Sequence, residues 1–268
     1  MCNYKVIDFH THPFDSDETN ICHHKTYCDM SIEKTERDLR NLGVQNICGS
    51  IITRNKPEVI TFDFVKSLND KAIKLAKQYN GFYIPGIHIH PDFVKESILE
   101  VERAHKEGVK IIGELVPSVF KWTIFPYACK GMHEIFEAIE HYKMIVSFHG
   151  HTAYDETAVK QTDEMVKTHK NITFVGAHIC DGAVLESHIR RLKENENYLV
   201  DLSGGGVYRH GVLRHVIDEC GADRVLFGSD YPVCNPSMYV YGVAKDFLLS
   251  ETEKKKILYE NAKKILGL

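Results

Sequence analysis

Residues 143–202 read KMIVSFHGHTAYDETAVKQTDEMVKTHKNITFVGAHICDGAVLESHIRRLKENENYLVDL, and the pattern in this stretch indicates the fold. Short apolar runs at 143–148, 172–176 and 198–202 alternate with longer amphipathic stretches at 155–169 and 182–194. Short apolar runs predict buried strands, whereas long amphipathic stretches predict helices. Strands that alternate with helices favour parallel βα units over a sandwich or a helix bundle.

The same alternation extends over the rest of the 268 residues. Five more strands are predicted at 4–9, 46–52, 82–88, 109–115 and 224–228. Further helices are predicted at 31–42, 57–79, 92–107, 131–141, 210–220 and 251–266, with a turn or short helix near 236–249. Eight such repeats in a chain of this length predict one α/β domain over residues 1–268, a (β/α)8 TIM barrel. A doubly wound open sheet usually has a Gly-rich phosphate loop after its first strand, and this sequence has none there.

Charge and composition describe an ordinary globular chain. The 33 basic and 37 acidic residues give a formal net charge of −4, with no long block of one sign. Nucleic acids and anionic membranes are therefore not expected partners, and a small-molecule substrate is. The sequence has no basic leader before an apolar run and no apolar stretch near the ~18 residues of a membrane span, so neither secretion nor membrane insertion is expected.

The eight cysteines are scattered along the chain and form no Cys-x-x-Cys pair. They resemble neither a disulfide framework nor a zinc ribbon, and free thiols are typical of a reducing compartment. A cytoplasmic location is therefore expected. Apolar helix faces also leave a homodimer open.

Ligand-type side chains follow several of the predicted strands. His10 and His12 come at the end of the first strand, and because side chains repeat every two residues along a strand, both project to the same side. The fifth, sixth and eighth strands are followed by His149 and His151, by His178, and by Asp230. In a barrel the carboxyl ends of all strands meet at one mouth. Imidazole nitrogens and a carboxylate there suit zinc, or a neighbouring ion such as manganese, iron or nickel.

This order of residues resembles the amidohydrolase superfamily of metal-dependent TIM-barrel enzymes. The most specific stretches are GADRVLFGSDYP at 221–232 and NAKKIL at 261–266, which look like the amidohydrolase-related branch. That branch contains hydrolases, lactonases, decarboxylases and hydratases. The resemblance implies a divalent metal surrounded by His10, His12, His178 or His149, and Asp230, with Asp230 also handling protons.

The sequence IGELVP at 112–117 departs from the pattern of many binuclear members, which carry a carboxylated lysine at the end of the fourth strand. Glu114 stands there instead. It either bridges two metal ions, or serves as a hydrogen-bond acceptor behind the ligands or as a substrate contact, and the sequence leaves all three roles open. One or two ions are therefore expected. With two ions, His149 would be a ligand of the second, and with one ion it would be a ligand or a substrate contact.

Three further side chains are candidates for substrate contact. His151 follows the fifth strand, and Arg209 follows the flexible loop 203–206 with a guanidinium suited to a carboxylate or phosphate. His90 belongs to a second His-x-His pair after the third strand, for which packing of the loop is the alternative. Asp8 shares the interior face of the first His-x-His pair and is expected to orient a ligand imidazole.

These features predict metal-dependent hydrolysis of a small-molecule ester, lactone or amide, with metal-activated water and with Asp230 as general base and then acid. One alternative is a decarboxylase on the same scaffold, in which the metal holds the substrate carboxylate. A second is a TatD-like phosphodiesterase or nuclease, because His-x-His, a Glu after the fourth strand, two later His and an Asp also describe that group. The absence of a basic groove in the charge pattern disfavours a polynucleotide substrate.

Overall fold

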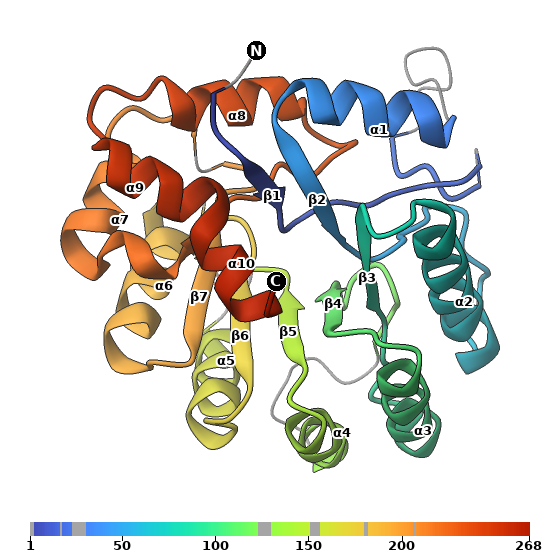
Figure 1. The fold of residues 1–268 in the computed structure, drawn as a ribbon. Helices are drawn as coiled ribbons and strands as arrows, with labels where there is room; N and C mark the ends of the chain where they lie inside the picture. The colour runs from blue at the N-terminus through green and yellow to red at the C-terminus, as the bar shows by residue number, and fades with distance from the viewer. Residues whose placement is uncertain are drawn as a thin grey trace.

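The computed structural model describes residues 3–16, 18–22, 31–122, 130–150, 156–179, 182–205 and 207–268. Its eight parallel strands lie in chain order in one sheet: β1 (Val6–Asp8), β2 (Val44–Gly49), β3 (Tyr83–Ile87), β4 (Ile111–Leu115), β5 (Ile145–Phe148), β6 (Thr173–Gly176), β7 (Tyr198–Asp201) and β8 (Val225–Leu226). The sheet curls round, and helices from the connections pack on its outside (Figure 1). The predicted single-domain (β/α)8 architecture is confirmed.

The helices are α1 (Ile32–Asn41), α2 (Phe62–Gln78), α3 (Val94–Lys106), α4 (Lys130–His141), α5 (Glu156–Thr168), α6 (Gly182–Glu194), α7 (Val212–Cys220), α8 (Pro236–Ala244), α9 (Glu251–Lys255) and α10 (Asn261–Leu266). A 3₁₀ turn (Ala222–Arg224) precedes β8, and a π-helical turn (Lys256–Glu260) joins α9 to α10. Across the described ranges, no helix has both the length and the apolar character needed to cross a membrane.

Local capping explains where several predicted boundaries were displaced. The helix predicted from residue 57 begins at Phe62, because the Thr61 side chain accepts a hydrogen bond from the backbone N of Phe64. The predicted eighth strand, 224–228, is only Val225–Leu226, since Arg224 belongs to the 3₁₀ turn. The segment 236–249 contains α8, which Asn235 caps. The elements themselves are those predicted.

The barrel interior is filled by apolar side chains from every strand. The buried cluster contains Ile7, Cys48, Ile111, Ile145, Val175, Leu199 and Leu226 from seven strands, with Ile84 of β3 packed against it. Ala262 and Leu266 of α10 belong to the same cluster, so the last helix covers one end of the barrel. Full burial of each large aliphatic side chain contributes about 1.5–3 kcal/mol to folding. The interior is therefore a packed core.

Backbone hydrogen bonds beyond the strand ends join β1 to β8. Phe9 N donates to the carbonyl oxygen of Phe227 at 2.8 Å, and Asp230 N donates to that of His10 at 2.8 Å. His12 N donates to the carbonyl oxygen of Tyr231 at 2.6 Å. This closure sets the two histidines after β1 directly beside the carboxylate after β8.

His88, which follows β3, gives the fold a testable pH dependence. Its side chain is buried, and one ring nitrogen, Nε2, lies 2.9 Å from the carbonyl oxygen of Ile51. Burial lowers its pKa from 6.5 to about 4, against the opposing effect of that hydrogen bond. As pH falls, the His88 side chain therefore binds a proton near pH 6.5 in the unfolded chain but only near pH 4 in the folded chain. The stability that this neutral imidazole contributes is complete above pH 6.5 and is lost as pH falls towards 4, by about 3 kcal/mol.

We therefore expect the free energy of unfolding of the His88→Gln variant to depend less on pH between 6.5 and 4 than that of the wild type. Urea denaturation at a series of pH values measures the difference. His210→Gln, which removes an exposed imidazole, is the matched control. Equal pH slopes for wild type and His88→Gln would contradict the assignment.

Candidate metal centre

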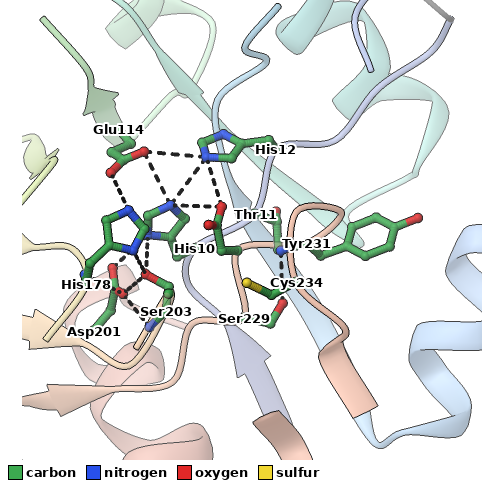
Figure 2. Close-up of polar contacts among 12 residues, drawn as sticks. His10, Thr11, His12, Glu114, His178, Asp201, Ser203, Ser229, Tyr231 and Cys234 are labelled. Atoms are coloured by element: carbon green, nitrogen blue, oxygen red, sulfur yellow. Dashed lines mark hydrogen bonds and ion pairs between the residues drawn. The ribbon is translucent and has the colours of Figure 1, made fainter. Parts of the chain in front are cut away.

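Six residues that the sequence suggested as metal ligands lie together at the carboxyl ends of the strands. They are His10 and His12 after β1, Glu114 in β4, His149 after β5, His178 after β6, and Asp230 after β8. Figure 2 shows the two histidines after β1 and His178 gathered around the Glu114 carboxylate. Of the six, His149 is the most exposed, with a side chain 32% accessible, and the others are buried.

Ligand atoms of His10, His12 and Glu114 lie within 4.8 Å of one another, and we call these three residues the first donor group. His10 Nε2 and His12 Nε2 are 3.3 Å apart, and each lies 3.4 Å from Glu114 Oε2. Asp230 Oδ1 lies 3.4 Å from His12 Nε2 and 3.7 Å from His10 Nε2. Ligand atoms around an ion with bonds of about 2.1 Å are separated by roughly 3.0–3.4 Å. The spacing of His10 Nε2, His12 Nε2 and Glu114 Oε2 therefore fits one divalent cation, and Asp230 Oδ1 lies beside the two histidines.

A second donor group uses the other oxygen of the same carboxylate. Glu114 Oε1 lies 2.8 Å from His149 Nδ1 and 3.3 Å from His178 Nε2. Three ligand-type atoms thus meet within 4.8 Å in this group as well. Glu114 thus lies between the two donor groups, with one carboxylate oxygen in each.

The charges of this cluster favour a cation. Burial lowers the pKa of His10, but Asp201 and Glu114 outweigh it and hold that pKa well above 6.5. Burial raises the pKa of Glu114, but His10 and His149 outweigh it and hold that pKa well below its ordinary value. The carboxylates that stabilise the protonated form of neighbouring imidazoles also attract a divalent cation. Such a cation would displace the protons when it binds to the imidazole nitrogens. The chemistry of the donors therefore fits a metal.

Two of these residues have backbone conformations that L-residues seldom adopt. His178 has φ 63° and Asp230 has φ 61°. The left-handed region costs roughly 1–2 kcal/mol for a residue with a Cβ atom. Strain of this kind concentrates at functional sites, where the surrounding structure compensates for it. The backbone after β6 and after β8 thus directs His178 and Asp230 toward the cluster, and these conformations lower the stability of the fold to some extent.

Asp201 and Ser203 were missed by the sequence reasoning. Asp201 Oδ2, at the end of β7, lies 2.9 Å from His10 Nδ1. Ser203 Oγ lies 3.0 Å from His10 Nδ1 and 2.9 Å from His178 Nδ1. The signal available in the sequence was an acidic residue at the end of a predicted strand, the same feature that pointed to the other ligands. These contacts hold the ring nitrogens that face away from Glu114.

Asp8 does not orient a ligand imidazole, and that expectation was wrong. Its carboxylate accepts hydrogen bonds from Ser229 N at 2.9 Å and from Ser229 Oγ at 2.5 Å, and a longer one from His10 N at 3.4 Å. Asp8 therefore ties β1 to the residue before Asp230. Burial raises its pKa to about 7, with the Ser229 hydrogen bonds acting in the opposite direction.

The three candidates for substrate contact have different outcomes. His90 is buried, its Nε2 lies 3.0 Å from the carbonyl oxygen of Phe120, and its ring packs near Trp122. No contact among the described residues connects His90 to the donor groups, so the structure supports the packing role. Arg209 is exposed, with its guanidinium 6.0 Å from the centre of the Tyr208 ring. His151 lies outside the described residues.

Comparison with known proteins agrees with this architecture. Residues 7–268 match the amidohydrolase family model. No curated protein matches the sequence.

Among solved structures, 2,6-dihydroxybenzoate decarboxylase from Rhizobium is similar, with TM-score 0.73, 15% identity, and coverage of 98% of this chain and 99% of that one. 5-carboxyvanillate decarboxylase from Sphingomonas paucimobilis is similar with TM-score 0.73 and 14% identity, and the match covers 99% of this chain and 100% of that one. A dihydroxybenzoic acid decarboxylase from Polaromonas sp. JS666, with bound manganese and the inhibitor 2-nitroresorcinol, is similar with TM-score 0.71 and 14% identity. The match covers 99% of this chain and 97% of that one. These likenesses show a shared fold. The family match over nearly the whole length shows that the chain belongs to the amidohydrolase family.

Proposed function

We propose that this protein is a metal-dependent hydrolase that acts on a small-molecule ester, lactone or amide at the carboxyl end of the barrel. The observation that carries the proposal is the Glu114 carboxylate, which has one oxygen in each of two donor groups. A carboxylate shared in this way suits two neighbouring divalent ions. When bound, such ions lower the pKa of water and polarise the scissile carbonyl.

Asp230 is the residue to which we assign proton transfer. It stands at the edge of the first donor group, and its backbone is anchored by the hydrogen bond from its N to the His10 carbonyl oxygen at 2.8 Å. A carboxylate held there can accept a proton from the attacking water and return it to the leaving group. His149 is the most accessible member of the second donor group and is the side chain we expect the substrate to approach first.

Decarboxylation is the second candidate, and the solved relatives favour it over hydrolysis. All three structures named above are of decarboxylases that act on aromatic carboxylic acids, and one contains manganese. On this chain, Asp230 would deliver a proton to the carbon that loses carbon dioxide, and no water would attack. The same relatives make manganese a candidate ion beside zinc.

A panel of esters, lactones, amides and phenolic or enol carboxylic acids, offered to Mn²⁺-loaded and Zn²⁺-loaded protein, tests the two reactions. In water enriched in oxygen-18, hydrolysis places one heavy oxygen in a product, whereas decarboxylation releases carbon dioxide and leaves the organic product free of the label. We expect turnover of a member of the first three classes with incorporation of the label. Carbon dioxide release with an unlabelled organic product would replace hydrolysis by decarboxylation. Turnover of a phosphodiester alone would contradict both.

A further inference from the structure

We infer that Asp201 and Ser203 together set the orientation and tautomer of His10 and His178. One hydrogen-bonded pair thereby positions one histidine ligand in each of the two donor groups. This inference rests on the proposed metal chemistry. Figure 2 shows the Asp201–Ser203 pair on the side of His10 and His178 that faces away from Glu114. All four side chains are buried, so none of these hydrogen bonds competes with bulk solvent.

The positions of the protons follow from the chemistry of the pair. An ionised carboxylate only accepts hydrogen bonds, and a serine hydroxyl has one proton and two lone pairs. Ser203 Oγ is in hydrogen-bond contact with Asp201 Oδ1 and therefore donates its proton there. Its lone pairs are then left to accept from His10 Nδ1 at 3.0 Å and from His178 Nδ1 at 2.9 Å. Asp201 Oδ2 is a second acceptor for His10 Nδ1, at 2.9 Å.

Once each imidazole is neutral, as a metal ligand must be, its single proton is thereby fixed on Nδ1. Their Nε2 atoms carry the free lone pair, and these are the atoms that lie 3.4 Å and 3.3 Å from the two oxygens of Glu114. A histidine ligand needs that lone pair for the metal and a hydrogen bond on its other nitrogen to keep its orientation. One hydroxyl thus serves His10 in the first donor group and His178 in the second.

The loop that follows Ser203 fits closely against the same ring. Gly204 has φ +70°, and a Cβ atom there would lie 2.6 Å from His178 Nδ1. His12 is held differently, because its Nδ1 lies 3.0 Å from the backbone carbonyl oxygen of Ser50. The pair is therefore specific to His10 and His178, and His12 serves as an internal reference that the pair does not contact.

Two variants separate the contributions of the pair. Ser203→Ala removes the shared acceptor and leaves the Nδ1 proton of His178 without it. Asp201→Asn replaces an acceptor by a group that also donates, so one imidazole must move its proton to Nε2 and lose its ligand lone pair. Ser97→Ala is the matched control, because Ser97 is also a buried serine and, among the residues that the structure describes, its hydroxyl contacts only the backbone of His90.

Mn²⁺ binding to the full chain, measured by calorimetric titration after removal of metal, tests the inference. We expect both Mn²⁺ affinities to fall about 10-fold to 100-fold in Ser203→Ala and to stay at the wild-type values in Ser97→Ala. Nitrogen-15 NMR of the histidines in Zn²⁺-loaded wild-type protein adds a readout that needs no variant, and we expect Nδ1–H tautomers for His10 and His178.

Wild-type affinities in Ser203→Ala, or Nε2–H tautomers in the wild type, would overturn the inference and leave the proposed function intact. If wild-type protein bound no Mn²⁺, the proposed function would fail and the inference with it. Thermal unfolding of the metal-free variants checks for a general loss of stability. A general loss would lower the melting temperature, but it would not lower the Mn²⁺ affinity of Ser203→Ala relative to that of Ser97→Ala.

Discussion

Replacement of Asp230 by Asn is expected to lower kcat by about 1,000-fold while metal remains bound. The amide keeps an oxygen that can face the first donor group, but it cannot accept and return a proton at neutral pH. The loss should therefore appear in kcat far more than in the number of ions bound. The measurement is the turnover of the substrate identified by the panel, with metal content determined on the same samples.

Asp223→Asn is the matched control for this prediction. Asp223 lies shortly before β8, its side chain is 70% exposed, and it pairs with Lys256 at 2.7 Å. We expect its kcat to equal that of the wild type. A variant Asp230→Asn that keeps its metal and turns over at the wild-type rate would show that another group handles the proton.

Gly113→Ala is expected to lower the free energy of unfolding by about 4 kcal/mol or more, an effect at the upper end for a single substitution. Gly113 precedes Glu114 and has φ +101°. A Cβ atom there would lie 2.1 Å from the carbonyl oxygen of Ser147 and 2.6 Å from Leu115 N. Both are backbone atoms of paired strands, β5 and β4, so neither can move without disturbing the sheet. Urea denaturation with a linear fit measures the loss.

Gly81→Ala separates the collision from the cost of the backbone conformation. Gly81 has φ +86°, but a Cβ atom there would meet nothing within 4 Å. We expect this control to lose only about 1 kcal/mol, from the left-handed conformation alone. Equal losses in the two variants would mean that the sheet adapts to the added methyl group and that close approach of β4 to β5 is not what requires glycine.

The sequence predicted the barrel and most of the donor set because both depend on local pattern. A period of two makes His10 and His12 point to one side, and the carboxyl ends of parallel strands meet whatever their order in the chain. The first residues of α2 and α8 were harder to predict from the sequence, because they depend on single capping side chains, Thr61 and Asn235. Element boundaries consequently shifted by a few residues while the elements themselves were present.

The hydrogen bonds behind the ligands could not be predicted in the same way. Asp201 and His10 are 191 positions apart, and their contact depends on the exact register of β7 and β8 against β1. Asp8 and Asp201 each end or nearly end a strand, so the sequence alone does not show which of them faces an imidazole. The closure of the barrel decides it, because it places Ser229 beside Asp8.

Metal content per chain tests the central claim most directly. Protein purified without chelator and reconstituted with Mn²⁺ or Zn²⁺ would be analysed by plasma mass spectrometry, together with Glu114→Gln. Glu107→Gln, a change at an exposed position paired with Lys77, is the control. The account predicts about two equivalents in the wild type and the control, falling to one or fewer in Glu114→Gln. One equivalent that is insensitive to Glu114 would contradict the shared carboxylate, and no bound metal after reconstitution would contradict the metal centre itself.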